Sequence, residues 1–291
     1  MKKLLLSLFL GSLMSMTLAA EIPQQQFNQS LYDQLPDSVK KAGVIRNVLD
    51  GSFPPYYSVT PDKKITGAMA DFAQALSEVL GVKIEHTVIP TLSANLMGIQ
   101  AGRYDISIGP VGDYPNREVK NDFVDYVQEY VVFAVQKGNP QKINGLEDVC
   151  GKKISVTAGG SAEAVIKKAS EECVKAGKPA VNVLTFDSQT TSALAVRSGR
   201  ADAFFSSQAP LSYFVSLNKD KMELSAVGKH NGFGEIYQGA VLAKDSPLTS
   251  VIVAAFQQLF DNGTYQAIMD KYNLHYNVID KPGKNLATDK H

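Results

Sequence analysis

Tryptophan is absent from this sequence, cysteine occurs only twice, and neither sign of charge is in surplus. The chain has 291 residues, in which 29 Lys and Arg balance 29 Asp and Glu. Without a basic surplus, little charge is available to neutralise a nucleic-acid backbone, so we expect no nucleic-acid partner. Hydrophobic residues make up 44% of the chain, which excludes an intrinsically disordered protein.

Motifs that carry catalysis are also missing. The chain has no Gly-x-Ser-x-Gly turn, no phosphate loop, no His-Glu-x-x-His and no complete Gly-x-Gly-x-x-Gly at a helix start. Its four histidines are scattered, and none stands beside an obvious nucleophile or within the spacing of a zinc site. We therefore expect no enzymatic activity, no cofactor and no metal.

The first twenty residues have the pattern of a secretory signal peptide. Two lysines precede an apolar run over residues 4–10, the apolar character continues to Leu18, and the small residues Ala19 and Ala20 follow. An uncleaved membrane anchor is the alternative, but polar residues interrupt the run before it reaches the ~20 apolar residues that span a bilayer. We expect cleavage near Ala19 or Ala20 and export of a soluble protein.

The two cysteines, Cys150 and Cys173, are expected to form a structural disulfide. An exported protein folds in an oxidising compartment, and closing a loop of this size stabilises the fold by roughly 3 kcal/mol in the chain-entropy model. A zinc site needs more closely spaced ligands, and a redox site usually has Cys-x-x-Cys. Neither pattern is present.

Short β-branched runs alternate with helical patterns in two series, residues 44–108 and 153–205. This alternation favours α/β units with a largely parallel sheet, and the length suits two lobes. Apolar runs at 131–135 and 237–243 carry the chain from one series to the other and back, which predicts a two-stranded hinge with a ligand cleft between the lobes. The expected division is residues 1–20 as signal peptide, 21–135 plus 238–291 as lobe 1, and 136–237 as lobe 2.

The segment 109–117, Gly-Pro-Val-Gly-Asp-Tyr-Pro-Asn-Arg, is the most informative one for binding. A glycine-rich loop at the end of a strand leaves backbone N–H groups free, and Arg117 offers a planar fork that matches a carboxylate through two hydrogen bonds. The alternative is an exposed arginine paired with Glu118 or Asp113. The segment thus predicts recognition of an anionic group.

Several motifs keep their order between about Val44 and Leu274. They are Asp50–Tyr56, Gly67–Asp71, Gly102–Ile108, Arg117–Asp125 and Asp202–Phe205. Together they resemble the periplasmic amino-acid-binding proteins of ABC importers, the extracellular solute-binding family 3. The resemblance implies two α/β lobes that close on an amino acid or related small carboxylate and present it to a membrane permease. Nothing in the sequence demands more than a monomer.

The resemblance also implies a ligand site, residue by residue. Arg117 would bind the ligand's carboxylate with help from backbone amides near it. Phe53 would place an aromatic ring against the ligand, or it is a core aromatic. Asp50 would contact a polar or cationic group, or it is a turn residue. Ser161 would bind an anion at a helix N-terminus, or it is an N-cap. The other residues assigned to the site are Pro110, Gly112, Gly160 and Ser207.

Three positions depart from the family pattern, and one of them is Met69, which replaces the first acid of the Gly-Phe-Asp-x-Asp pattern. Ser207 stands where members that bind α-amino acids usually have the carboxylate that holds the ammonium, and Gly112 stands where Ser or Thr is common. A hydroxyl cannot supply the charge that a buried ammonium needs. The ligand's amino group is therefore expected to bind another acid, such as Asp113 or Glu235, or the ligand has no amino group.

Three hypotheses about function follow. The first is a periplasmic solute-binding protein of an ABC importer, without catalysis. The second is an enzyme on the same scaffold that resembles the cyclohexadienyl dehydratases, with Glu235 or Asp113 as general acid. A sensor module is a third and weaker hypothesis.

Overall fold

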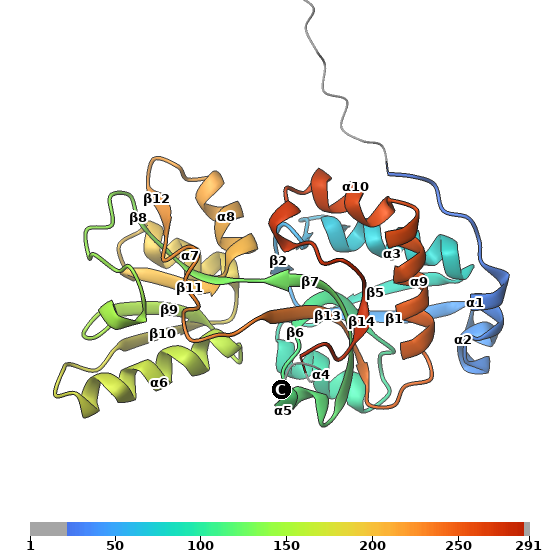
Figure 1. The fold of residues 1–291 in the computed structure, drawn as a ribbon, viewed down its shortest axis with the longest axis horizontal. Coiled ribbons are helices and arrows are strands. Elements are labelled where there is room, and N and C mark those ends of the chain that lie inside the picture. Colours follow the sequence, from blue (N-terminus) through green and yellow to red (C-terminus); the bar gives the residue numbers. More distant parts are fainter. Residues whose placement is uncertain (1–21, 288–291) are drawn as a thin grey trace, which may run out of the picture.

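The computed structural model describes residues 22–287, so the expected signal peptide lies outside the described residues (Figure 1). Two α/β lobes lie side by side along the longest axis and are connected by two strands. This architecture confirms the fold class expected from the sequence. None of the helices within residues 22–287 combines the length and the hydrophobicity that a bilayer-spanning helix needs.

The first lobe is built on three sheets. In the first of them, β1 pairs in parallel with β5. A longer sheet has the order β14-β7-β13-β6, and a small antiparallel sheet has the order β2-β3-β4. The strands are β1 (Val44–Leu49), β2 (Ser52–Phe53), β3 (Tyr57–Val59), β4 (Ile65–Thr66), β5 (Lys83–Val88), β6 (Ser107–Gly112), β7 (Asn121–Glu129), β13 (Ile236–Ala243) and β14 (Gly283–Lys284). The helices are α1 (Gln29–Asp33), α2 (Asp37–Ala42), α3 (Ala68–Leu80), α4 (Leu92–Gln100), α5 (Pro115–Glu118), α9 (Thr249–Asp261), α10 (Thr264–Lys271) and the 3-10 helix η2 (His275–Asn277).

The last helices of the chain, α9 and α10, pack against α3 in this first lobe (Figure 1). An aromatic cluster holds the three helices to β7. The rings of Tyr126 and Phe256 stack with their centroids 4.7 Å apart, and Phe72 stacks on Tyr265 at 5.9 Å. All four side chains are buried. Burial of the apolar faces of α9 and α10 therefore packs the C-terminal part of the chain onto the first lobe.

The second lobe has a single five-stranded sheet of order β10-β9-β11-β8-β12. Its strands β9, β10 and β11 are parallel to one another, whereas β8 and β12 run antiparallel to their neighbours. The strands are β8 (Val131–Gln136), β9 (Lys153–Thr157), β10 (Asn182–Phe186), β11 (Ala203–Ser207) and β12 (Met222–Ser225). The helices are the 3-10 helix η1 (Leu146–Asp148), α6 (Ser161–Lys175), α7 (Gln189–Arg197) and α8 (Gln208–Ser216).

The chain crosses between the lobes at Tyr130 and again just before Ile236. β7 ends at Glu129, which pairs with Ile236 of β13, and β8 begins at Val131, which pairs with Ser207 of β11. The boundary expected after residue 135 is therefore corrected, because the whole of β8 hydrogen-bonds within the second sheet. An apolar run shows that a strand forms but not which sheet it joins, so the sequence placed this crossing too late.

Glu129 lies at the first crossing, and groups from both lobes surround its carboxyl. Its Oε1 accepts hydrogen bonds from the backbone N–H of Tyr130 at 2.9 Å and of Ala209 in the second lobe at 3.4 Å. The side chain of Asn277 in the first lobe donates to the same oxygen at 3.1 Å, and the Tyr56 hydroxyl donates to Oε2 at 3.4 Å. Burial raises the pKa of Glu129 to about 7.

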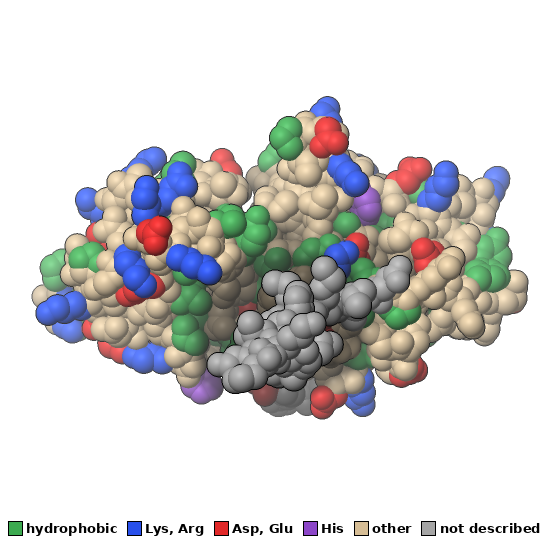
Figure 2. Space-filling view, turned by 90° about the horizontal axis from the view of Figure 1, so that it is seen from above, with side chains coloured by type: hydrophobic (Ala, Val, Ile, Leu, Met, Phe, Trp, Pro, Cys, Tyr) green, Lys and Arg blue, Asp and Glu red, His purple; other side chains and the backbone are tan. Residues whose placement is uncertain are grey.

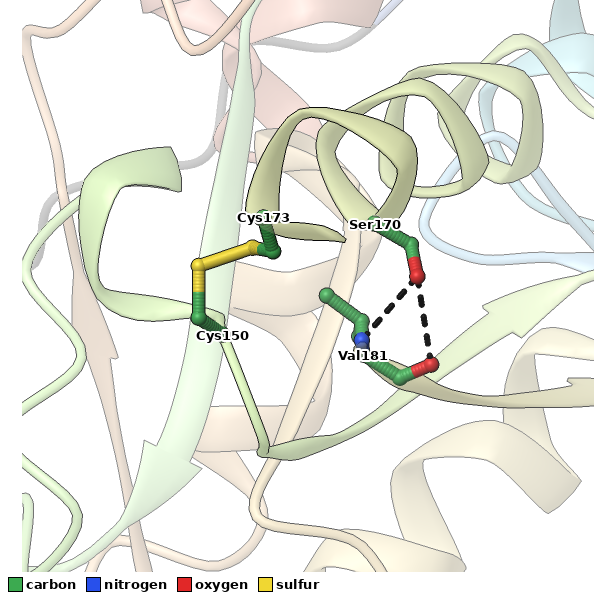
Figure 3. The surroundings of a disulfide bond; sticks show 4 residues. All are labelled: Cys150, Ser170, Cys173 and Val181. Carbon is green, nitrogen blue, oxygen red and sulfur yellow. Dashed lines mark hydrogen bonds between the residues drawn. A yellow bond between two sulfur atoms is a disulfide. The ribbon is translucent and has the colours of Figure 1, made fainter. Parts of the chain in front are cut away.

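Cys150 and Cys173 form the expected disulfide (Figure 3). The bond ties the segment before β9 to the last turns of α6. Next to it, the Val181 backbone N–H donates to Ser170 Oγ at 3.0 Å, which anchors the same helix to the segment before β10. The disulfide therefore secures the end of α6 that lies away from Ser161, the residue at which this helix begins.

We expect the double variant Cys150→Ser/Cys173→Ser to lose about 3 kcal/mol of unfolding free energy, because the unfolded chain regains the entropy that the closed loop removes. Urea unfolding of the purified proteins measures the difference. Wild-type protein in reducing agent is the control and should match the variant. Equal midpoints for the oxidised wild type and the variant would show that the disulfide adds no stability.

Because of the buried carboxyl of Glu129, we expect the free energy of unfolding to fall as the pH rises from about 4.5 to 7. Its folded pKa of about 7 exceeds its unfolded value of 4.5, so between these values the unfolded chain releases a proton that the folded protein keeps. The difference between the folded and unfolded pKa of Glu129 lowers the free energy of unfolding by about 3 kcal/mol between pH 4.5 and pH 7. Glu129→Gln should abolish that part of the pH dependence in urea titrations, whereas Glu171→Gln, at an exposed position of α6, should keep it. A wild-type pH profile in Glu129→Gln would contradict the assignment.

Candidate functional site

A cleft of about 910 Å³, part of it open to solvent, separates the two lobes. All eight ligand-site residues expected from the sequence line it. The first lobe contributes Asp50, Phe53, Pro110, Gly112 and Arg117, and the second contributes Gly160, Ser161 and Ser207. The structure thus brings together side chains that lie up to 157 positions apart in the chain, from Asp50 to Ser207. On the face shown in Figure 2, charged side chains of both signs are interspersed on both lobes.

Arg117 lies in the cleft wall on the short helix α5, which begins with Pro115 directly after β6. Its Nη1 donates to the Gly112 carbonyl at 2.9 Å, and its guanidinium carbon lies 5.1 Å from the centre of the Tyr114 ring. No carboxylate oxygen of residues 22–287 lies within 4.0 Å of the guanidinium, so the alternative of an arginine paired with Glu118 or Asp113 is not what the structure shows. Burial lowers the pKa of Arg117, because desolvation penalises its charge.

Gly112 lies against the ring of Tyr114. A Cβ built at Gly112 would lie 2.5 Å from the Tyr114 Cε2 atom, closer than side chains approach one another. The serine or threonine that is common at this position in the family would displace that ring. At Gly112, the absence of a side chain leaves room for the Tyr114 ring in the cleft wall.

The lobes touch each other across the cleft. The Tyr114 hydroxyl of the first lobe and the Ser161 hydroxyl of the second are hydrogen-bonded at 2.8 Å. A Cβ built on Gly159 would lie 3.3 Å from the Ser93 Oγ of α4, so a second pair of segments is also in close contact. The N-cap of α6 is Gly160 rather than Ser161, which corrects the N-cap alternative and leaves the Ser161 hydroxyl for the other lobe.

Phe53 and Asp50 each have a structural partner as well as a place in the cleft. The Phe53 ring stacks on Tyr56 with a centroid distance of 5.6 Å and packs against the core of the first lobe. The Tyr57 hydroxyl donates to Asp50 Oδ1, and burial raises the pKa of Asp50 despite this bond. Both residues therefore line the cleft and also make contacts within the first lobe, and their contact with a ligand stays a prediction.

Asp113 and Glu235 do not line the cleft, which corrects the expectation that one of them faces the ligand. Both border a separate depression. Asp113 is 2% exposed, accepts a hydrogen bond from the Ala287 N–H at 3.2 Å and lies beside the fully buried Asp125. Burial raises the pKa of Asp113 and, more strongly, that of Asp125. The acids that do border the cleft are Asp50 and Asp187.

Sequence reasoning missed several polar residues of the cleft wall. They are Tyr57, Thr91, Tyr114, Thr157, Asp187, Gln189, Ser206 and Gln238. Gln189 Oε1 accepts a hydrogen bond from Ser206 Oγ at 3.0 Å. Gln238 Oε1 and Thr157 Oγ1 are buried and have no hydrogen-bond partner among the described residues. Tyr114 could have been found, because it lies within the glycine-rich segment, whereas the glutamines stand in no recognisable motif.

Proteins similar to this chain include two that are named for the amino acids they bind. The arginine-binding protein ArgT of Corynebacterium glutamicum is 27% identical over 252 residues, which cover 85% of this chain and 80% of that protein. The L-cystine-binding protein TcyJ of Escherichia coli is 28% identical over 241 residues, which cover 82% and 85%. A solved ancestral arginine-binding protein bound to arginine superposes with a TM-score of 0.71 at 28% identity, and the match covers 79% of this chain and 98% of that one.

The model of one protein family matches residues 45–275, most of the chain and nearly the whole span over which the motifs keep their order. The family resemblance inferred from the motifs is thereby confirmed. The chain belongs to the bacterial extracellular solute-binding proteins, family 3.

Proposed function

We propose that this protein is the periplasmic solute-binding component of an ABC importer, which captures an amino acid or a related small carboxylate and delivers it to a membrane permease. The observation that carries the proposal is Arg117, a cation in the wall of the interlobe cleft without a carboxylate partner among the described residues. A ligand carboxylate would supply the missing charge in a bidentate pair. The relatives named for arginine and L-cystine support an amino acid as the solute.

A binding role is favoured over the dehydratase-like enzyme. The two acids considered as its general acid, Asp113 and Glu235, border a depression other than the cleft. A general acid has to reach the reacting atoms to within hydrogen-bond distance. Release of product from prephenate or arogenate by the purified protein would support the enzyme and overturn the proposed binding role.

Arg117→Ala should weaken amino-acid binding at least 100-fold, because it leaves a ligand carboxylate desolvated without its partner. Arg117→Lys should bind more tightly than Arg117→Ala and less tightly than the wild type, because lysine keeps the positive charge but lacks the two parallel N–H donors of the guanidinium. Isothermal titration calorimetry against the twenty L-amino acids measures both effects. Arg103→Ala, at an exposed position after α4, is the matched control and should bind as the wild type does. Unchanged affinity in Arg117→Ala would remove Arg117 from the site.

Tyr114→Phe should shift the protein towards an open arrangement of the lobes, since it deletes the hydrogen bond to Ser161 that joins them. One such bond corresponds to about a 2- to 10-fold loss of affinity. Small-angle scattering with and without ligand should show a larger radius of gyration for the ligand-free variant. Tyr276→Phe, at a position 70% exposed, is the control. A variant as compact and as tight-binding as the wild type would show that this contact does not govern closure.

A further inference from the structure

Gln238 of β13 is a buried polar side chain that the proposed site does not yet use. It is 6% exposed and borders the cleft, and its Oε1 has no hydrogen-bond partner among the described residues. A buried amide oxygen without a donor costs about 1–3 kcal/mol, so such groups are rare in folded proteins. A donor supplied by a molecule in the cleft would remove that cost.

The register of the sheet places Gln238 next to the loop that holds Arg117. Gln238 pairs with Gly112 of β6, and the Gly112 carbonyl is the group to which the Arg117 guanidinium donates. Arg117 and Gln238 are therefore both neighbours of Gly112 in the cleft wall. In an α-amino acid, one carbon carries both the carboxylate and the nitrogen. When Arg117 binds the carboxylate of an α-amino acid, the nitrogen of that ligand accordingly comes within reach of the cleft wall around Gln238.

The acids that border the cleft are less suited to that nitrogen. Asp50 already accepts a hydrogen bond from Tyr57, and Asp187 is exposed on the second lobe. Ser207, also on the second lobe, carries no charge. Across the cleft from Gln238, Thr157 Oγ1 at the end of β9 is the other buried lining atom without a partner in the described part of the chain. The two buried lining oxygens without a hydrogen-bond partner, Gln238 Oε1 and Thr157 Oγ1, are thus both neutral groups.

We infer that Gln238 determines specificity by accepting, through Oε1, a hydrogen bond from the α-nitrogen of the ligand whose carboxylate Arg117 binds. The inference rests on the proposed function and adds to it a chemical class: ligands with a nitrogen donor on the carbon next to the carboxylate. Because the acceptor is a neutral amide, the contact selects for a donor at this position without needing an ionic pair.

The test uses the full mature chain and the L-amino acid that binds most tightly among the twenty, together with its deamino analogue. Q238M keeps the shape of the side chain and removes the acceptor. It should weaken binding of the amino acid about 5- to 150-fold and change binding of the deamino analogue by less than 3-fold. Q238E keeps the acceptor and adds charge, so it should bind the amino acid at least as well as the wild type and the deamino analogue more weakly.

Calorimetry gives the ratio of the two affinities, which a merely structural role would not change. Gln128→Met, on the neighbouring strand and outside the cleft lining, is the matched control. Equal losses of affinity for both ligands in Q238M would overturn the inference, because the amide would then serve the fold. Loss of amino-acid binding in Q238E would also overturn it, because the amide N–H would then donate to the ligand carboxylate. A wild type that binds no amino acid would overturn the proposed function, whereas binding with an unchanged ratio in the variants would overturn only the role of Gln238.

Discussion

The antiparallel pairing of β7 with β13 is the constraint on which the rest of the structure depends. β13 pairs with β7 along one edge and with β6 along the other, so a single strand joins the interlobe crossing to the loop that holds Arg117. Backbone hydrogen bonds hold this register, and a shift by one residue would turn Gln238 away from the cleft. The first-lobe half of the site can therefore keep its shape while the lobes move about the crossings at Tyr130 and Ile236.

Desolvation decides where charge resides around this sheet. Arg117 faces the cleft, where a ligand can neutralise it. Behind the cleft wall, Asp113 and Asp125 are covered by the segment that follows β14, and Glu129 is enclosed at the crossing. Burial raises the pKa of all three carboxyls, which favours their neutral forms. Neutral acids behind a charged arginine leave its positive potential directed at the cleft.

Much of the site could be predicted from local patterns. A glycine-rich loop that ends in arginine indicates anion recognition by itself, and the two cysteines of an exported chain indicate a disulfide. The buried oxygens of Gln238 and Thr157 in the cleft wall could not be predicted, because glutamine and threonine form no motif and the surrounding strands show only apolar patterns. Neither oxygen has a hydrogen-bond partner within residues 22–287, and hydrogen-bond partners are set by residues far away in the chain.

By itself, the sequence determined the alternation of strands and helices, the arginine loop and the existence of two lobes, because each rests on residues close together in the chain. Only the tertiary structure decided that β8 joins the second sheet, that Asp113 and Glu235 lie outside the cleft, and that Gln238 stands beside Gly112. The physical reason is that strand pairing joins distant segments through backbone groups, which are the same for every residue type except proline and so leave little trace in the sequence.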